Sequence, residues 1–203
     1  KTELVNAIFG NYKVKEGEIY IKGKPVKIRN PRDAIKNRIG LVPDERKQLG
    51  LITMFNVKEN TILPSIKRFA RFVFSNHKKE MQAAYEFNER MRLAYTSLWQ
   101  RVSKLSGGNQ QKIVIAKWML ADTEIFLFDE PTRGIDIGAK VEIYKLIDEL
   151  TKQGKGVILV SPELEEIIGL SNRVYIMFEG EIRDEVYGER KTQSVIINSL
   201  LGG

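Results

Sequence analysis

Three short, unbroken apolar runs set the strongest limit on how this chain can fold. They are IGLVP at residues 39–43, EIFLF at 124–128 and GVILV at 156–160, and stretches with helical spacing of apolar residues separate them. A strand that is apolar on both faces has to be covered on both faces, as in a parallel sheet between layers of helices. The sequence therefore predicts an α/β fold with a mostly parallel sheet.

Helices are predicted between these strands. Apolar spacing and flanking glycines place them over about residues 3–9, 109–120, 138–152 and 163–169. Asn30 followed by Pro31 predicts the start of a further short helix, because asparagine caps helices and proline suits their first turn.

Two antiparallel hairpins and one helical insertion complete the expected fold. Residues 17–29 alternate apolar and polar side chains around a turn at 23–25, and RVYIMF at 173–178 precedes a second hairpin partner. Between about 56 and 105 the strand signals vanish and the spacing becomes helical. We therefore expect one domain over residues 1–203 with a helical subdomain inserted at about 56–108.

Composition narrows the chemistry only slightly. The chain has no cysteine, which excludes disulfides, thiolate metal sites and thiol catalysis. Its formal charge of +7 favours anionic partners such as nucleotides, nucleic acid or an acidic membrane surface, although a solvated basic surface is the simpler explanation. The apolar runs are far shorter than the roughly 20 residues that cross a bilayer, so any membrane contact is expected to be peripheral.

Two acids follow directly after the second apolar run. Asp129 and Glu130 end the strand, and Pro131 follows them. In open α/β sheets, ligands bind at the carboxyl ends of the strands. There the first carboxylate can hold Mg2+ and the second can orient or deprotonate an attacking water. For this stretch alone, a solvated acidic turn after a strand would also be a plausible interpretation.

Lys1 and Thr2 stand at the head of the first predicted helix. A lysine followed by a hydroxyl residue forms the end of the Gly-rich nucleotide loop, in which the lysine reaches the β- and γ-phosphates and the hydroxyl ligates Mg2+. The glycines of such a loop are expected upstream of Lys1, so we interpret the chain as N-terminally incomplete. The pair carries meaning only together with Asp129 and Glu130.

A second phosphate cradle is predicted at Ser106, Gly107 and Gly108. These residues open a helix, where backbone N–H groups are free and glycine allows close approach of a phosphate. They follow the helical insertion, and we expect them to lie away from Lys1 and Asp129, so the phosphate that they reach belongs to another domain's nucleotide. For an isolated Gly-Gly pair, a plain helix start would be the better interpretation.

Taken together, these motifs resemble those of an ABC-type ATPase over essentially the whole chain. LSGGNQQK at 105–112 is similar to the signature motif, IFLFDEP at 125–131 to the Walker B strand and GIDIGAK at 134–140 to the D-loop. VPDERKQLGLI at 42–52 and DEPTRGIDIGAK at 129–140 narrow the resemblance to the second ATPase domain of bacterial importers of ribose, galactose and xylose.

The resemblance implies a fold, cofactors, site residues and partners. The implied fold is a P-loop NTPase core of ABC type, and the implied cofactors are ATP and Mg2+. Glu130 is the implied catalytic residue, and Thr2, Asp44 and Asp129 are the implied metal ligands. The implied nucleotide-binding residues are Lys1, Thr2, Glu3, Asp44, Ser106, Gly107, Gly108, Gln110 and Asp136.

The implied partners are a second ATPase domain, either fused or a homodimer mate, and membrane permease subunits. A periplasmic or extracellular sugar-binding protein is an indirect partner, and no nucleic acid is expected. Two such domains close head to tail, and each signature caps the ATP on the other's lysine loop. The implied location is the cytoplasmic face of the membrane, and the basic and aromatic part of the insertion docks the permease. Its residues are Lys67, Arg68, Phe69, Arg71, Phe72 and Phe74.

Two positions depart from a complete ABC site. The histidine that usually contacts the γ-phosphate is replaced by Pro162, and the usual glutamine is replaced by Asp44, or by Glu45 if the register is shifted by one. The only histidine, His77, is interpreted as an exposed polar residue of the insertion. We therefore hypothesise that this domain binds Mg-ATP but hydrolyses it slowly, although Glu130 keeps hydrolysis possible.

Two rival functions remain compatible with the sequence. An ABC-type ATPase that acts on nucleic acid in translation or repair would use the positive charge, but 44–106 is too short for the long coiled coil of the repair members. A regulatory platform without turnover would agree with Pro162. The sugar itself is not predicted, because the resemblance places selectivity in other subunits.

Overall fold

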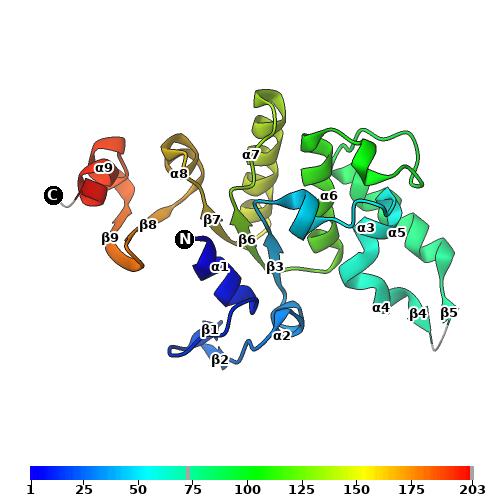
Figure 1. Ribbon diagram of the computed structural model, residues 1–203, viewed down its shortest axis with the longest axis horizontal. Helices are drawn as coiled ribbons and strands as arrows, with labels where there is room; N and C mark the ends of the chain where they lie inside the picture. The colour runs from blue at the N-terminus through cyan, green and yellow to red at the C-terminus, as the bar shows by residue number, and fades with distance from the viewer. Residues whose placement is uncertain (72–73, 202–203) are drawn as a thin grey trace.

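The computed structural model describes residues 1–71 and 74–201 and has a parallel sheet at its centre (Figure 1). Within these residues the sheet has the strand order β3-β6-β7, with β3 (Ile39–Val42), β6 (Ile125–Asp129) and β7 (Gly156–Val160). Leu127 of β6 pairs in parallel with Leu41 on one side and Ile158 on the other. The predicted α/β fold with a mostly parallel sheet is confirmed.

Helices pack on this sheet as their apolar spacing predicts. They are α1 (Thr2–Phe9), α2 (Pro31–Lys36), α6 (Gly107–Leu120) and α7 (Ile137–Lys152). The predicted helix α8 (Leu164–Leu170) also forms and lies beside α7. Trp118 of α6 packs edge-on against Phe9 of α1, with ring centroids 5.7 Å apart, and donates a hydrogen bond to the Leu41 carbonyl at 2.6 Å. Gly40 allows this approach, because a Cβ there would lie 2.8 Å from the Trp118 ring.

Asn30 begins α2 as predicted, and the first hairpin differs from the prediction only in its turn. The Asn30 side chain accepts hydrogen bonds from the amides of Arg32 and Asp33. The hairpin pairs β1 (Ile19–Ile21) with β2 (Lys24–Val26). The turn consists of Lys22 and Gly23, with φ of 52° and 75°, so Pro25, which the sequence placed in the turn, lies in β2. A tight two-residue turn with positive φ at both positions explains the shift.

The insertion is helical but not purely so. Its helices are α3 (Val57–Ile62), α4 (Ile66–Phe69) and α5 (His77–Arg90). A short antiparallel hairpin, β4 (Ala70–Arg71) with β5 (Phe74–Ser75), corrects the prediction that strands are absent from this segment. Strands of two residues are too short to produce a visible alternation.

The basic and aromatic part of the insertion takes part in packing where it is described. Phe69 packs against the main core, and Arg68 Nη1 donates to the Leu120 carbonyl at 2.5 Å. Phe72 lies outside the described residues. His77 is exposed, as predicted, and stacks on Trp99 with ring centroids 5.6 Å apart.

A short π-helix, Arg46–Gly50, follows β3 and had no sequence signal. The buried Lys117 ammonium on α6 donates to the Gly50 carbonyl and holds the end of this turn. Burial lowers the pKa of Lys117 to about 8, because the charged ammonium loses solvation. The π-helix therefore keeps a fixed position beside α6.

The C-terminal part forms a second, smaller core. It contains the predicted hairpin of β8 (Arg173–Phe178) and β9 (Glu181–Tyr187) and an unpredicted helix α9 (Gln193–Leu201). β8 and β9 lie apart from the central sheet, beyond β7 (Figure 1). Since β7 is therefore an edge strand, Ile158 is 40% exposed, which corrects the expectation that this strand is covered on both faces. Among the described helices, none combines the length and apolar character needed to cross a membrane.

Candidate functional site

The carboxyl edge of the central sheet gathers the predicted acids and the start of α1. Asp129 is the last residue of β6, and Thr2 is the first of α1. Thr2 Oγ1 donates a hydrogen bond to Asp129 Oδ1 at 3.1 Å across 127 residues of sequence. The bond joins the lysine–threonine motif to the Asp129–Glu130 motif. The sequence alone could place these two motifs together only by analogy with known nucleotide sites.

Asp129 is a buried carboxylate, only 1% exposed. Burial raises its pKa above the usual range, the neighbouring Asp44 and Glu130 charges add to the rise, and the Thr2 hydrogen bond opposes it. The ionised carboxylate therefore lacks sufficient compensating charge from the chain. A divalent cation beside it would supply that charge.

We expect Asp129→Asn to stabilise the protein without nucleotide or Mg2+. The raised pKa means that ionised Asp129 costs folding free energy at neutral pH, a cost absent below the unfolded pKa of about 4 and present once pH exceeds the folded pKa. The shape is kept, and Asn Oδ1 still accepts from Thr2. The melting temperature in EDTA at pH 7.5 should rise by about 2–4 °C, which corresponds to a gain in the free energy of unfolding on the order of 1 kcal/mol.

The gain should vanish near pH 4 and reverse with Mg-ATP, because only the carboxylate binds the cation. Asp148→Asn is the matched control, since Asp148 is exposed on α7 and pairs with Lys152. A lower melting temperature for Asp129→Asn in EDTA would contradict the account of Asp129 as an uncompensated charge.

Glu130 stands at the same edge in an unusual backbone conformation. Its φ is 44°, a left-handed value that costs an L-residue roughly 1–2 kcal/mol, and its amide donates to the Val160 carbonyl of β7 at 2.8 Å. Such strain is kept where the surrounding structure fixes it and clusters at functional sites. The bend turns the Glu130 side chain into the space beyond the strand ends.

A pocket of about 280 Å3 opens beside Glu130. It is lined by Glu130, Thr132, Arg133, Gly134, Ile135, Lys140, Ser161, Pro162 and Glu163. The loop that carries Thr132 is anchored at the buried Glu166 carboxylate of α8. Thr132 and Tyr144 both donate hydrogen bonds to that carboxylate. The catalytic candidate and the proline that replaces histidine therefore face one cavity.

Asp44, rather than Glu45, faces the site. Arg133 Nη1 donates to Asp44 Oδ2 at 2.8 Å, and the Asp44 charge helps raise the pKa of Asp129. Glu45 is exposed and precedes the π-helix. Sequence reasoning missed Arg133, because an arginine in a polar loop carries no spacing signal of its own.

The arrangement suits Mg2+ held mostly by water and phosphate. Thr2 and Asp129 offer a hydroxyl and a carboxylate together, which Mg2+ accepts while keeping several waters. No group of three or more His, Asp or Glu side chains forms a metal cage within 1–71 and 74–201. Asp44 is held by Arg133, so its predicted role as a ligand requires that pair to open.

The second cradle is built by the start of α6. Ser106 is exposed and caps the helix, with its Oγ 3.4 Å from the Asn109 amide and 2.9 Å from Asn109 Nδ2. Gly107 packs against Arg46, since a Cβ there would lie 2.6 Å from Arg46 Nη2. Gly108 is buried against Ala139 of α7. In the described structure no hydrogen bond joins this turn to Thr2 or Asp129.

The remaining predicted residues have different surroundings. Lys1 occupies the position before α1 without a side-chain capping bond and is exposed, as is Glu3 in the first turn. Asp136 caps α7 by accepting from the Ala139 amide at 2.9 Å. Gln110 is buried, and its Nε2 donates to the Val102 and Leu105 carbonyls, so its side chain serves helix packing and we leave it out of the proposed nucleotide contacts.

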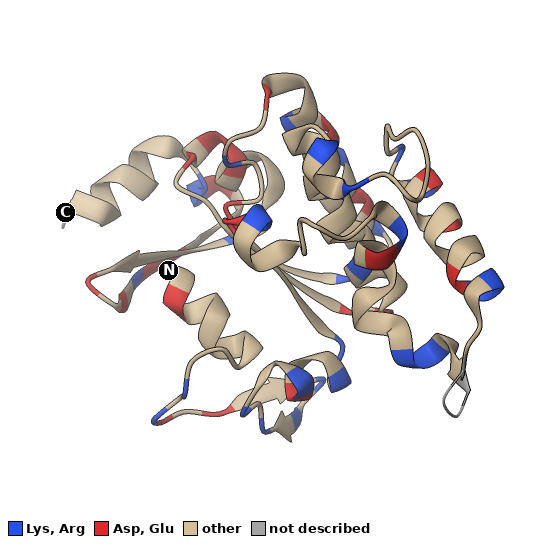
Figure 2. Cartoon of the chain, turned by 45° about the vertical axis from the view of Figure 1, so that its right-hand side comes forward, with Lys and Arg blue, Asp and Glu red and all other residues tan. Residues whose placement is uncertain are grey.

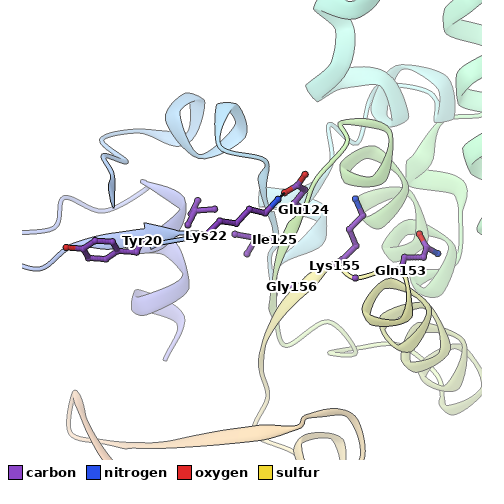
Figure 3. Close-up of a pocket in the computed structure, with 9 residues that line it drawn as sticks. Tyr20, Lys22, Glu124, Ile125, Gln153, Lys155 and Gly156 are labelled. Atoms are coloured by element: carbon purple, nitrogen blue, oxygen red, sulfur yellow. Dashed lines mark hydrogen bonds and ion pairs between the residues drawn. The ribbon is translucent and has the colours of Figure 1, made fainter. Parts of the chain in front are cut away.

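A larger pocket of about 370 Å3 lies at the opposite edge of the sheet and contains none of the predicted site residues (Figure 3). It lies where β6 and β7 begin, at Ile125 and Gly156, and Lys22 pairs across it with Glu124 at 2.8 Å. Basic and acidic residues are interspersed over the helices and loops in Figure 2 rather than gathered in one stripe. This distribution favours a solvated basic surface over a nucleic-acid footprint.

Comparison with known proteins gives consistent matches. A family model described as ABC transporter matches residues 1–133. The chain is 44% identical over its whole length to the Xylose import ATP-binding protein XylG of Thermoanaerobacter pseudethanolicus, covering 40% of that protein. It is 40% identical over its whole length to the Ribose import ATP-binding protein RbsA of Bacillus subtilis, covering 41% of it. The chain thus spans about two fifths of these relatives.

Solved structures show the same fold. A nucleotide-free ATP-binding cassette from an ABC transporter superposes with a TM-score of 0.79 at 21% identity, over 100% of this chain and 79% of that one. A dimeric ATP-binding cassette in a post-hydrolysis state with ADP and phosphate superposes with a TM-score of 0.74 at 25% identity, over 92% and 79%.

Proposed function

Because this chain belongs to the ABC transporter family, we propose that it is the second nucleotide-binding domain of a sugar importer's ATP-binding protein. Its relatives are named for xylose and ribose import, and the chain corresponds to about two fifths of their length. In this proposal ATP closes two such domains on each other, and hydrolysis and release reopen them. The movement drives a membrane permease that carries a monosaccharide.

The observation that carries the proposal is the hydrogen bond from Thr2 to Asp129. It brings Thr2, which we propose to be the end of a nucleotide loop, to the end of the strand that bears Asp129 and Glu130. Lys1 would contact the β- and γ-phosphates, and Thr2 with Asp129 would hold Mg2+ between them. The buried, uncompensated charge of Asp129 supports this assignment, because Mg2+ would neutralise it.

Glu130 would act on the attacking water. In hydrolysis the water oxygen bonds to the γ-phosphorus, and its proton goes to the Glu130 carboxylate. The bond from the γ-phosphorus to the bridging oxygen breaks, and that electron pair leaves with ADP. Pro162 has no titratable group that could help to move a proton, so we propose that this step is slow at this site.

The two cradles would then serve two different nucleotides. The edge at Thr2 and Asp129 would hold this domain's own ATP, while Ser106 to Gly108 would cap the ATP on the partner domain. The dimeric cassette with ADP and phosphate supports a paired arrangement. The helical insertion would dock a permease subunit, which would place the domain at the cytoplasmic face of the membrane, with a sugar-binding protein as an indirect partner.

The test is Mg-ATP hydrolysis by the full-length protein that contains this chain. We expect Glu130→Gln to keep at least about half of the steady-state rate, because a site without positioned acid-base help turns over about 100-fold to 10,000-fold more slowly. Glu149→Gln, an exposed substitution of the same kind on α7, is the control. A collapse of the rate would show a fully working site and reject the slow-site proposal, while no hydrolysis by the wild type would reject the motor.

A further inference from the structure

The pocket that Pro162 lines carries two cationic side chains, Arg133 and Lys140. Lys140 is already paired, since its Nζ lies 2.5 Å from Glu163 Oε1 and its side chain is largely covered. Arg133 is 57% exposed and extends along the edge of the sheet. Arg133 is therefore the more exposed of the two cations that line this pocket.

Arg133 lies between two acids of the candidate site. Its Nη1 is 2.8 Å from Asp44 Oδ2, and its Nε is 4.0 Å from Glu130 Oε2. If Glu130 acts on the water that attacks the γ-phosphorus, a cation within 4.0 Å of Glu130 lies next to that phosphate. Arg133 also lines the same pocket as Pro162, the residue that stands at the position of the usual histidine.

The backbone that carries Arg133 is held firmly. The carbonyls of Arg133 and Gly134 accept hydrogen bonds from Arg46 Nη1 and Nη2 at 2.7 Å and 3.1 Å. The Arg133 amide donates to the Glu130 carbonyl at 3.1 Å, which closes a tight turn between the two residues. A side chain on a fixed backbone reaches its target with little ordering cost.

We propose that Arg133 contacts the γ-phosphate of ATP bound at this chain's own site, in the pocket where Pro162 offers no side-chain contact. The inference rests on the proposed function and assigns a further nucleotide-binding residue to it; an arginine binds phosphate but exchanges no proton, so slow hydrolysis at this site still follows. Arginine suits this contact, because its planar guanidinium binds phosphate oxygens in a bidentate manner and stays charged at all physiological pH values.

The contact would require Arg133 to leave Asp44. Exposed ion pairs of this kind are weak, and a γ-phosphate carries more charge than a carboxylate, so the exchange is favourable once ATP is bound. The exchange frees the Asp44 carboxylate for a water on Mg2+, which reconciles its predicted role as a metal ligand with its present pairing. Binding of the γ-phosphate would thus release Asp44 from its ion pair with Arg133.

Equilibrium binding of a non-hydrolysable ATP analogue and of ADP tests this role. The full-length protein is used, with the other domain's nucleotide site disabled by replacing the lysine of its phosphate loop. Arg133→Gln should weaken the analogue about 10-fold to 100-fold, the range of a charged hydrogen-bonded contact, and ADP less than about 2-fold. Arg133→Lys keeps the charge but not the bidentate guanidinium, so its affinity for the analogue should lie between those of the wild type and Arg133→Gln.

Arg38→Gln is the matched control, since Arg38 is similarly exposed and pairs with Asp122 and Glu124 at the other edge of the sheet. Equal losses for ADP and the analogue would show that Arg133 only shapes the loop, and unchanged affinity for both would remove it from the site. Either result overturns the inference. A wild-type site that binds neither nucleotide would reject the proposed function itself.

Discussion

Replacing Ser106 by Asp in the full-length protein should lower steady-state Mg-ATP hydrolysis by about 100-fold or more. Ser106 stands exposed at the head of α6, where in the proposed arrangement it meets the γ-phosphate on the partner domain. A carboxylate at this point would repel the phosphate at close range, in a closed interface that screens charge poorly. The rate should fall at the working site, which lies on the partner.

The substitution separates chemistry from folding. Asp caps a helix as well as Ser does, and its negative charge suits the positive end of the helix dipole. Ser106→Asn keeps the cap without the charge and is the matched control, so both variants should melt within about 2 °C of the wild type. Hydrolysis by the Asn variant should fall far less than by the Asp variant.

Comparing Ser106→Asp with Glu130→Gln tests whether the two proposed ATP sites differ in their rates of hydrolysis. Ser106 acts on the partner's ATP and Glu130 on this domain's own, so the first change should stop most turnover and the second should leave most of it. If the two variants lose activity to the same degree, the sites are equivalent. If Ser106→Asp retains most of the rate, the start of α6 does not cap a working site.

The central sheet could be predicted because each of its strands is a short apolar run that can be recognised without knowledge of distant residues. IFLF and IGLV can only be buried, and acids directly after such a strand have to emerge at its carboxyl end. Thr2 and Asp129 could be paired only through the resemblance, since their contact spans 127 residues and no periodicity records it. The structure supplies that pairing as a hydrogen bond.

What the sequence missed depends on tertiary contacts. Arg133 lies in a turn and Arg46 begins the π-helix, and neither position has a sequence signal. Their contacts form only in the folded chain: Arg133 donates to Asp44, and Arg46 donates to the Arg133 and Gly134 carbonyls. The exposure of Ile158 follows from the position of β7 at the edge of the sheet, which local apolarity does not reveal. The resemblance implied Gln110 as a nucleotide-binding residue, and its burial likewise follows only from the packing of α6.

Replacing Gly10 by Ala should destabilise the protein by about 2–5 kcal/mol, the sum of a left-handed backbone penalty and overpacking. Gly10 ends α1 with a φ of 84°, and a Cβ there would lie 2.6 Å, 2.8 Å and 2.9 Å from backbone atoms of Asn30. Backbone atoms at the cap of α2 do not move aside as a flexible side chain would. The melting temperature should fall by roughly 5–20 °C.

Gly23→Ala separates the two causes of this loss. Gly23 has a φ of 75°, but nothing lies within 4 Å of its would-be Cβ, so the alanine meets only the backbone penalty of about 1–2 kcal/mol. Since α1 carries Lys1 and Thr2 at its other end, any Gly10→Ala protein that folds with a shifted α1 should also bind Mg-ATP more weakly at this site, whereas Gly23→Ala should not. If both variants lower the melting temperature equally, Gly10 is not in close contact with the Asn30 backbone. The position of Thr2 beside Asp129 would then need another explanation.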